Sequence, residues 1–134
     1  ELDRVLPETD LLIMSLPATP ATENIMDARR LSLLGKKAFL INVGRGSALD
    51  QTALEDLLRR GRLAGAALDV FRQEPVPRED TLWTCPNLLM TPHVAGNMTL
   101  PYTTERILAQ FLENLTAYSE GKPLKHVVSP EVGY

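Results

Sequence analysis

Four short, nearly continuous apolar runs constrain the fold of this chain more than any other feature. They cover residues 11–15, 38–43, 64–70 and 87–90, and segments with helical patterns separate them. Strands that are covered on both faces have continuous apolar runs, whereas half-exposed strands alternate apolar and polar residues. Strands that alternate with helices over short connections predict an α/β fold with a parallel sheet. We therefore expect parallel strands that are covered on both faces.

The segments between the runs carry helix signals. Asp27 and Asp50 can cap helices over residues 27–34 and 50–60, because an aspartate at the N-cap accepts a hydrogen bond from a first-turn amide. A last helix should begin near Pro101, since proline is favoured in the first turn. Its apolar stripe is interpreted as core or interface, and comprises Ile107, Leu108, Phe111, Leu112 and Leu115. The residues from 122 to 134 are expected to form an extended strap.

Composition excludes several classes of function. The 134 residues are 44% hydrophobic and 23% charged, which is typical of a globular chain. A net charge of −3 argues against a general nucleic-acid binder, and no apolar run is long enough to span a membrane. Cys85, interpreted as a packing residue, is the only cysteine, so neither a disulfide nor a metal site is expected. This cysteine usage suits a reducing, cytoplasmic setting.

Glycines and polar residues follow the carboxyl ends of the predicted strands. In open α/β sheets, ligands bind just beyond those ends. The rule selects four places in this chain: Leu16-Pro17, residues 43–46, residues 69–74 and Pro92-His93. We expect a ligand site built from these loops.

Arg45 lies between two glycines directly after the second apolar run. A guanidinium there can hold a carboxylate through two parallel hydrogen bonds, and Gly44 and Gly46 could take positive φ and let a ligand approach. The alternative is a surface arginine in an ordinary tight turn. Residues 44–49 resemble a dinucleotide fingerprint, but the third glycine is missing and no suitable first strand precedes it. We therefore reject this segment as a pyrophosphate loop.

Three titratable residues at the strand ends are candidate acid–base or ligand-binding groups. Asp69 ends the most apolar run, so it must either accept hydrogen bonds from nearby backbone amides or face a ligand. Glu74 is followed closely by Pro75 and Pro77, which stiffen the loop, although a solvated glutamate is the alternative. His93 ends the fourth strand and is either catalytic or a structural hydrogen-bonding group. His126, in the tail, is interpreted as a surface residue.

Four motifs, taken in order, resemble the NAD(P)-dependent D-2-hydroxyacid dehydrogenases. They are residues 16–22 (Leu-Pro-Ala-Thr-Pro-Ala-Thr), 42–46 (Asn-Val-Gly-Arg-Gly), 65–71 (Gly-Ala-Ala-Leu-Asp-Val-Phe) with Glu74-Pro75, and 91–96 (Thr-Pro-His-Val-Ala-Gly). Each motif alone is weak. The ordered set is highly specific and covers residues 5–128.

The resemblance implies the second half of a Rossmann-type doubly wound parallel sheet, plus a C-terminal helix and tail. Residues 1–97 would be a partial NAD(P)-binding domain, and residues 98–134 would be a returning helix and tail that join the substrate domain. The family's Gly-x-Gly-x-x-Gly motif does not occur in this sequence. The chain thus looks like the C-terminal part of such an enzyme, and we expect it to be inactive on its own.

The resemblance also implies a role for each candidate residue. Arg45 would bind the substrate carboxylate and polarise the 2-keto group. His93 would be the general acid in reduction and the base in oxidation, and Glu74 would hydrogen-bond it, orient its ring and tune it. Asp69 would contact the nicotinamide carboxamide. The residues at the nicotinamide end of NAD or NADP would be Leu16, Pro17, Val43, Gly44, Arg45, Asp69, His93 and Gly96.

The implied reaction transfers a hydride between NAD(P)H and a small 2-keto acid to give a D-2-hydroxy acid, in a homodimer. Formate dehydrogenases, which are relatives, carry glutamine where this chain has Glu74, so that branch is disfavoured. An alternative within the family is a dinucleotide-sensing, corepressor-like protein without metabolic turnover. The candidate catalytic residues do not discriminate between the two, since such corepressors retain them.

Overall fold

The structure, a computed structural model, describes residues 1–96, 98 and 100–131. The chain forms two compact units, Glu1–Ala95 and Gly96–Tyr134. None of the helices in the described residues is both long and apolar enough to cross a membrane.

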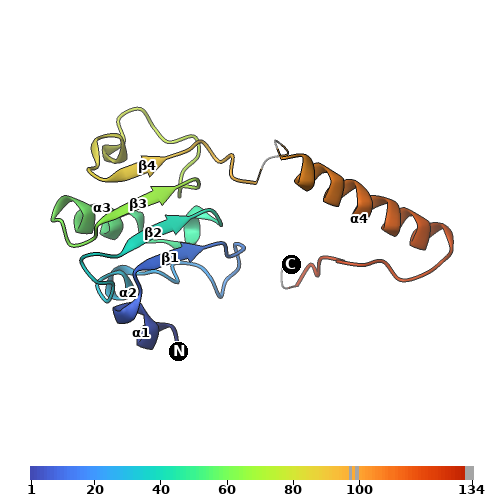
Figure 1. Cartoon of the computed structure of the whole chain (residues 1–134), viewed down its shortest axis with the longest axis horizontal. Coiled ribbons are helices and arrows are strands. Elements are labelled where there is room, and N and C mark those ends of the chain that lie inside the picture. Colours follow the sequence, from blue (N-terminus) through green and yellow to red (C-terminus); the bar gives the residue numbers. More distant parts are fainter. Residues whose placement is uncertain (97, 99, 132–134) are drawn as a thin grey trace. The chain divides into compact units, whose positions relative to one another are not determined.

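The first unit is built on four parallel strands in the order β1-β2-β3-β4 (Figure 1). Each strand lies within one of the predicted apolar runs. The strands are β1 (Leu11–Met14), β2 (Phe39–Asn42), β3 (Gly65–Leu68) and β4 (Leu88–Met90). The expected α/β fold with a parallel sheet is confirmed.

Two of the helices between the strands begin at the predicted N-caps. Asp27 accepts a hydrogen bond from the Arg30 amide at the start of α2 (Ala28–Leu31), and Asp50 accepts one from the Ala53 amide at the start of α3 (Gln51–Arg59). The α2 helix ends before residue 34, because residues 32–34 form a turn. The remaining short elements of this unit are α1 (Leu2–Val5), η1 (Leu6–Glu8), η2 (Gly46–Ala48) and η3 (Thr81–Thr84).

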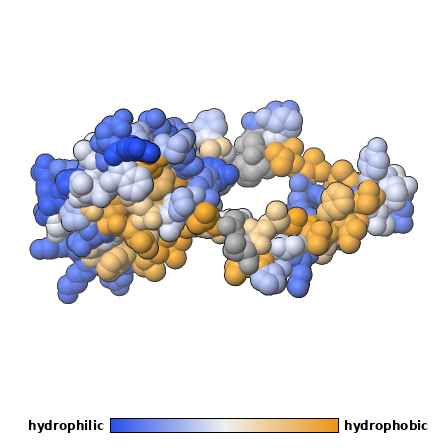
Figure 2. All heavy atoms as spheres, turned by 90° about the horizontal axis from the view of Figure 1, so that it is seen from above, coloured by the Kyte–Doolittle hydropathy of each residue, from blue (hydrophilic) through white to orange (hydrophobic). Residues whose placement is uncertain are grey.

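One face of the sheet is packed and the other is open, which differs from the expected cover on both faces. Strand order follows chain order, so crossovers of one hand place α2 and α3 on the same side. On that side Leu40 and Leu68 are buried in the core. On the opposite side Ile13, Phe39 and Leu89 are 58%, 51% and 64% exposed. Hydrophobic side chains are correspondingly visible at the surface in Figure 2.

The second unit consists of α4 (Pro101–Ser119) and the tail. The helix begins at the predicted proline, and Gly121 follows its end with a φ of 65°. The Asn114 side chain joins the tail to the helix, because it donates to the Lys125 carbonyl and accepts from the Lys125 amide. The predicted apolar stripe of α4 is exposed throughout. Its interpretation as core or interface stays a prediction.

Candidate active site

The register of the sheet brings the carboxyl ends of all four strands to one edge. Met14 pairs with Asn42, Asn42 with Leu68, and Leu68 with Met90. The predicted site residues follow these strand ends directly. The loops that we expected to build a ligand site therefore lie next to one another.

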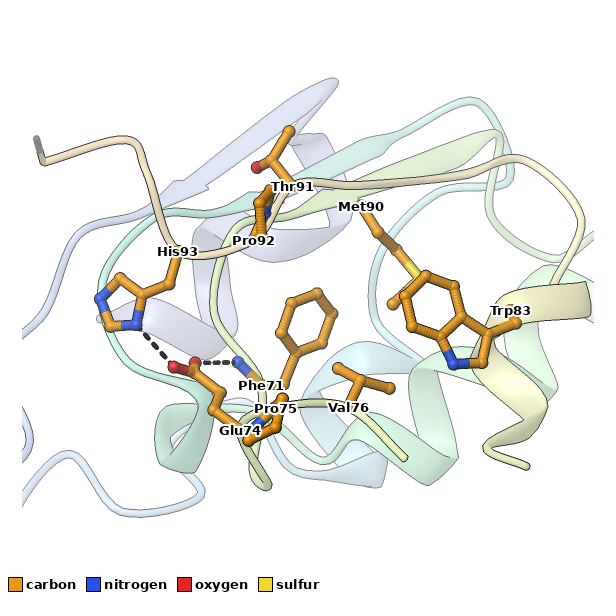
Figure 3. Close-up of a pocket in the computed structure, with 9 residues that line it drawn as sticks. All are labelled: Phe71, Glu74, Pro75, Val76, Trp83, Met90, Thr91, Pro92 and His93. Atoms are coloured by element: carbon orange, nitrogen blue, oxygen red, sulfur yellow. Dashed lines mark hydrogen bonds and ion pairs between the residues drawn. The ribbon is translucent and has the colours of Figure 1, made fainter. Parts of the chain in front are cut away.

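Glu74 and His93 form a hydrogen-bonded pair at this edge (Figure 3). The distance between His93 Nδ1 and Glu74 Oε2 is 2.6 Å, and Glu74 Oε1 accepts from the Phe71 amide at 2.8 Å. The bond with His93 first, and the Phe71 amide second, hold the pKa of Glu74 below its ordinary value. An ionised carboxylate can only accept, so the proton in this bond is assigned to Nδ1.

The second ring nitrogen of His93 is available to a ligand. Figure 3 shows Nε2 on the side of the ring away from Phe71 and Trp83. Nε2 makes no hydrogen bond to any residue that the structure describes, and the side chain is 46% exposed. A mainly apolar cavity of about 640 Å³, walled by Phe71, Val76, Trp83 and Met90, lies on the opposite side of the ring. Nε2 therefore points away from this cavity.

Asp69, which follows β3, is almost entirely buried, with 4% of its surface exposed. Oδ1 accepts from the Thr91 hydroxyl at 2.5 Å and from the Val94 amide at 2.9 Å, and Oδ2 accepts from the Ala95 amide at 2.9 Å. Burial would raise the pKa of Asp69, but these hydrogen bonds outweigh it and lower the pKa. Asp69 thus accepts bonds from nearby amides, one of the two roles that the sequence leaves open.

Arg45 follows β2 and is exposed to solvent. Its guanidinium donates to the Gly44 carbonyl at 2.8 Å. The buried Asn42 side chain holds this turn, because it donates to the Arg45 carbonyl at 3.0 Å and accepts from the Gly44 amide at 3.1 Å. An arginine on a braced turn and open to solvent is suited to bind an anion.

Gly44 and Gly46 are needed for close backbone contact rather than for positive φ, which corrects the prediction. Neither is among the positive-φ residues of the described chain. A Cβ on Gly44 would lie 2.7 Å from the backbone nitrogen of Leu16, and one on Gly46 would lie 2.0 Å from the carbonyl of Phe71. The backbone of neighbouring loops closely approaches both glycines. They pack the Arg45 turn against the loops that carry Leu16 and Glu74.

A second, shallower cavity of about 280 Å³ lies at the same ends of the strands. Val43, Val94 and Ala95 provide aliphatic walls, and Asp69 and Thr91 provide the polar edge. This lining suits a flat, mainly apolar ring that carries a polar substituent.

For the other predicted cofactor residues, the structure shows position and exposure but no contact that indicates a role. Leu16 and Pro17 are exposed on the loop after β1, against the Arg45 turn. Gly96 belongs to the second unit, and a Cβ on it would meet nothing within 4 Å. The contacts of these residues with a cofactor stay predictions.

Sequence reasoning missed the part that Thr91 and the Phe71 amide play in the site. One signal was available for Thr91. Asp69 and Thr91 each lie at the carboxyl end of a predicted strand. Because Leu68 pairs with Met90, the two residues lie side by side. No pattern in the sequence indicates that the Phe71 amide binds Glu74.

Comparison with known proteins identifies the family. The model of the family described as D-isomer specific 2-hydroxyacid dehydrogenase, NAD binding domain, matches residues 1–95. A curated relative, glyoxylate/hydroxypyruvate reductase B of Pectobacterium carotovorum, is 36% identical over 98% of this chain. The match spans 41% of that relative. A glyoxylate reductase of Korarchaeum cryptofilum is 35% identical, and 39% of its length is covered.

Solved structures of the same family resemble the fold. A D-isomer specific 2-hydroxyacid dehydrogenase of Xanthobacter autotrophicus, in complex with NADPH and MES, has a TM-score of 0.86 and 39% identity; the match covers 99% of this chain and 53% of that one. An NADPH-dependent glyoxylate/hydroxypyruvate reductase of Sinorhizobium meliloti, in complex with NADP and sulfate, also has a TM-score of 0.86, with 34% identity and coverages of 99% and 42%. The chain therefore belongs to the D-isomer specific 2-hydroxyacid dehydrogenase family and carries part of its NAD-binding domain.

Proposed function

We propose that this chain is the C-terminal part of an NAD(P)-dependent dehydrogenase that interconverts a 2-keto acid and a D-2-hydroxy acid. The observation that carries the proposal is the Glu74–His93 pair, in which a carboxylate occupies Nδ1 and leaves Nε2 open. The names of the relatives, glyoxylate/hydroxypyruvate reductase and glyoxylate reductase, support small 2-keto acids as substrates.

His93 acts as the proton donor and acceptor. With Nδ1 donating to Glu74, Nε2 carries a proton only in the imidazolium form. In reduction, that proton passes from Nε2 to the oxygen of the alkoxide that forms. In oxidation, neutral Nε2 takes the hydroxyl proton back. Glu74 keeps the ring oriented in both directions of the reaction.

Arg45 binds the carboxylate of the substrate. A guanidinium offers two parallel donors to a carboxylate, and its charge also stabilises negative charge that develops on the keto oxygen. The turn that carries Arg45 is packed against the Phe71–Glu74 loop through Gly46. Substrate held by Arg45 is thereby positioned for proton transfer at His93.

The cavity at the strand ends fits the nicotinamide ring of NAD or NADP. Val43, Val94 and Ala95 would pack against the ring, and Leu16, Pro17, Gly44 and Gly96 would line its surroundings. The bound cofactor supplies the hydride. The sequence has no glycine fingerprint to hold the pyrophosphate. We therefore expect the isolated 134-residue chain to be inactive.

Turnover of the complete polypeptide that carries this chain tests the proposal. We expect oxidation of NADH or NADPH with glyoxylate and hydroxypyruvate, and D-glycerate as the product of hydroxypyruvate by chiral chromatography. Dinucleotide binding by calorimetry without turnover on a panel of 2-keto acids would favour the corepressor-like alternative. Activity of the isolated chain would contradict its expected dependence on a phosphate-binding segment.

A further inference from the structure

We propose that Asp69 is a positioning residue, which holds the backbone around His93 in the conformation that brings the imidazole to Glu74. The proposal rests on the proposed function only in taking His93 as the acid–base group. The geometric evidence is the set of hydrogen bonds that Asp69 accepts from residues on both sides of His93.

The backbone of His93 needs such support. Its φ is 54°, in the left-handed region that residues with a side chain seldom adopt. The His93 amide donates to the Thr91 carbonyl at 3.0 Å, so the chain turns tightly at this point. This conformation costs free energy, which contacts of the flanking residues can offset.

Asp69 supplies these contacts from the neighbouring strand. Its carboxylate accepts hydrogen bonds from Thr91 on one side of His93, and from Val94 and Ala95 on the other. The carboxylate is buried, and hydrogen bonds to an ionised acceptor are stronger than neutral ones in such surroundings. Its lowered pKa keeps it ionised and accepting at neutral pH. The three bonds form a clip around His93.

Asp69 and Glu74, which make these contacts, both lie on the loop that follows β3. Asp69 fixes the backbone on both sides of His93, and Glu74, braced by the Phe71 amide, fixes the ring. The direction of Nε2 therefore depends on both carboxylates. A carboxylate has about four acceptor positions. This one binds three donors of its own chain, so one acceptor position remains for the nicotinamide contact that the resemblance implies.

Amide hydrogen exchange of the ¹⁵N-labelled chain tests the clip without requiring activity. Asp69→Asn preserves shape but replaces one acceptor oxygen by a donor, so at least one of the Val94 and Ala95 amides should lose protection. Core amides such as that of Leu40 should keep theirs, which shows that the fold persists. Thr91→Val, which leaves both amide bonds in place, should cause a smaller loss. Unchanged protection of Val94 and Ala95 in Asp69→Asn would overturn the clip.

Kinetics of the complete polypeptide separate positioning from cofactor binding. Asp69→Asn should lower kcat by roughly 100-fold, as expected for a slightly misplaced catalytic group, with little change in the KM for NAD(P)H. Asp27→Asn is the matched control, because asparagine also caps a helix well and α2 should be unaffected. An increase in the KM for NAD(P)H at unchanged kcat would assign Asp69 to the cofactor and overturn the proposal. If the unmodified polypeptide has no turnover, the proposed function fails, while hydrogen exchange still decides the clip.

Discussion

The two histidines of this chain share an unusual backbone but differ in their surroundings. The φ angles of His93 and His126 are 54° and 55°. His93 is paired with Glu74, and the Asp69 clip surrounds its backbone. His126 lies in the exposed tail. Surroundings rather than residue type thus distinguish the candidate acid–base group, and His126 provides a natural control for it.

The lowered pKa of Glu74 predicts a pH-dependent contribution to stability. A carboxyl whose pKa is depressed by folding stabilises the protein above its ordinary value of 4.5 and loses this contribution as the pH falls through the folded-state pKa. Glu74→Gln should therefore lower the urea midpoint of the chain more above pH 4.5 than at pH values well below it. A difference between the two proteins that stays constant over this range would contradict the assignment.

Arg45 is predicted to matter more for the keto acid than for the cofactor. Arg45→Ala removes charged hydrogen bonds to the substrate carboxylate, and kcat/KM for hydroxypyruvate should fall on the order of 100-fold. Arg45→Lys should recover part of the loss, because lysine keeps the charge but not the paired donors. Steady-state kinetics measure both. Arg60→Ala, which removes an exposed arginine paired with Asp56, is the control and should leave kcat/KM unchanged. A larger change in the KM for NAD(P)H than in that for hydroxypyruvate would refute the role.

At the scale of elements, η2 and the loop after β3 are packed through a single glycine. Gly46→Ala would force a Cβ to within 2.0 Å of the Phe71 backbone, which cannot move aside like a flexible side chain. The free energy of unfolding should fall by about 2 kcal/mol or more, as measured by urea titration. Gly35→Ala, where a Cβ meets nothing within 4 Å, should change it by less than about 0.5 kcal/mol. Equal effects of the two substitutions would show that this contact is unimportant.

Elements and their order were predictable from the sequence because their signals are local. The apolar runs gave the four strands, and Asp27, Asp50 and Pro101 marked three helix starts. The spacing of Asp69, Glu74 and His93 was also visible. The contacts of Asp69 were not, because they join residues more than 20 positions apart across two strands. Likewise, the need for Gly46 arises from Phe71, which is distant in sequence.

At the scale of the whole molecule, the apolar runs predicted two covered faces of the sheet, and the structure has one. A continuous apolar run indicates that a strand is suited to burial on both faces. Whether each face is covered depends on which other elements pack against it. The open face carries Ile13, Phe39 and Leu89. The chain spans about two fifths of the curated relatives that it matches. The roles proposed for its site residues are therefore best tested in the complete polypeptide.

The turnover number of His93→Ala tests the central claim most directly. General acid–base catalysis contributes about 100- to 10,000-fold, so kcat for reduction of hydroxypyruvate should fall by a factor in that range. His126→Ala, the matched control in the exposed tail, should keep the kcat of the unmodified protein. Near-normal turnover of His93→Ala would contradict the assignment of the Glu74–His93 pair as the acid–base centre.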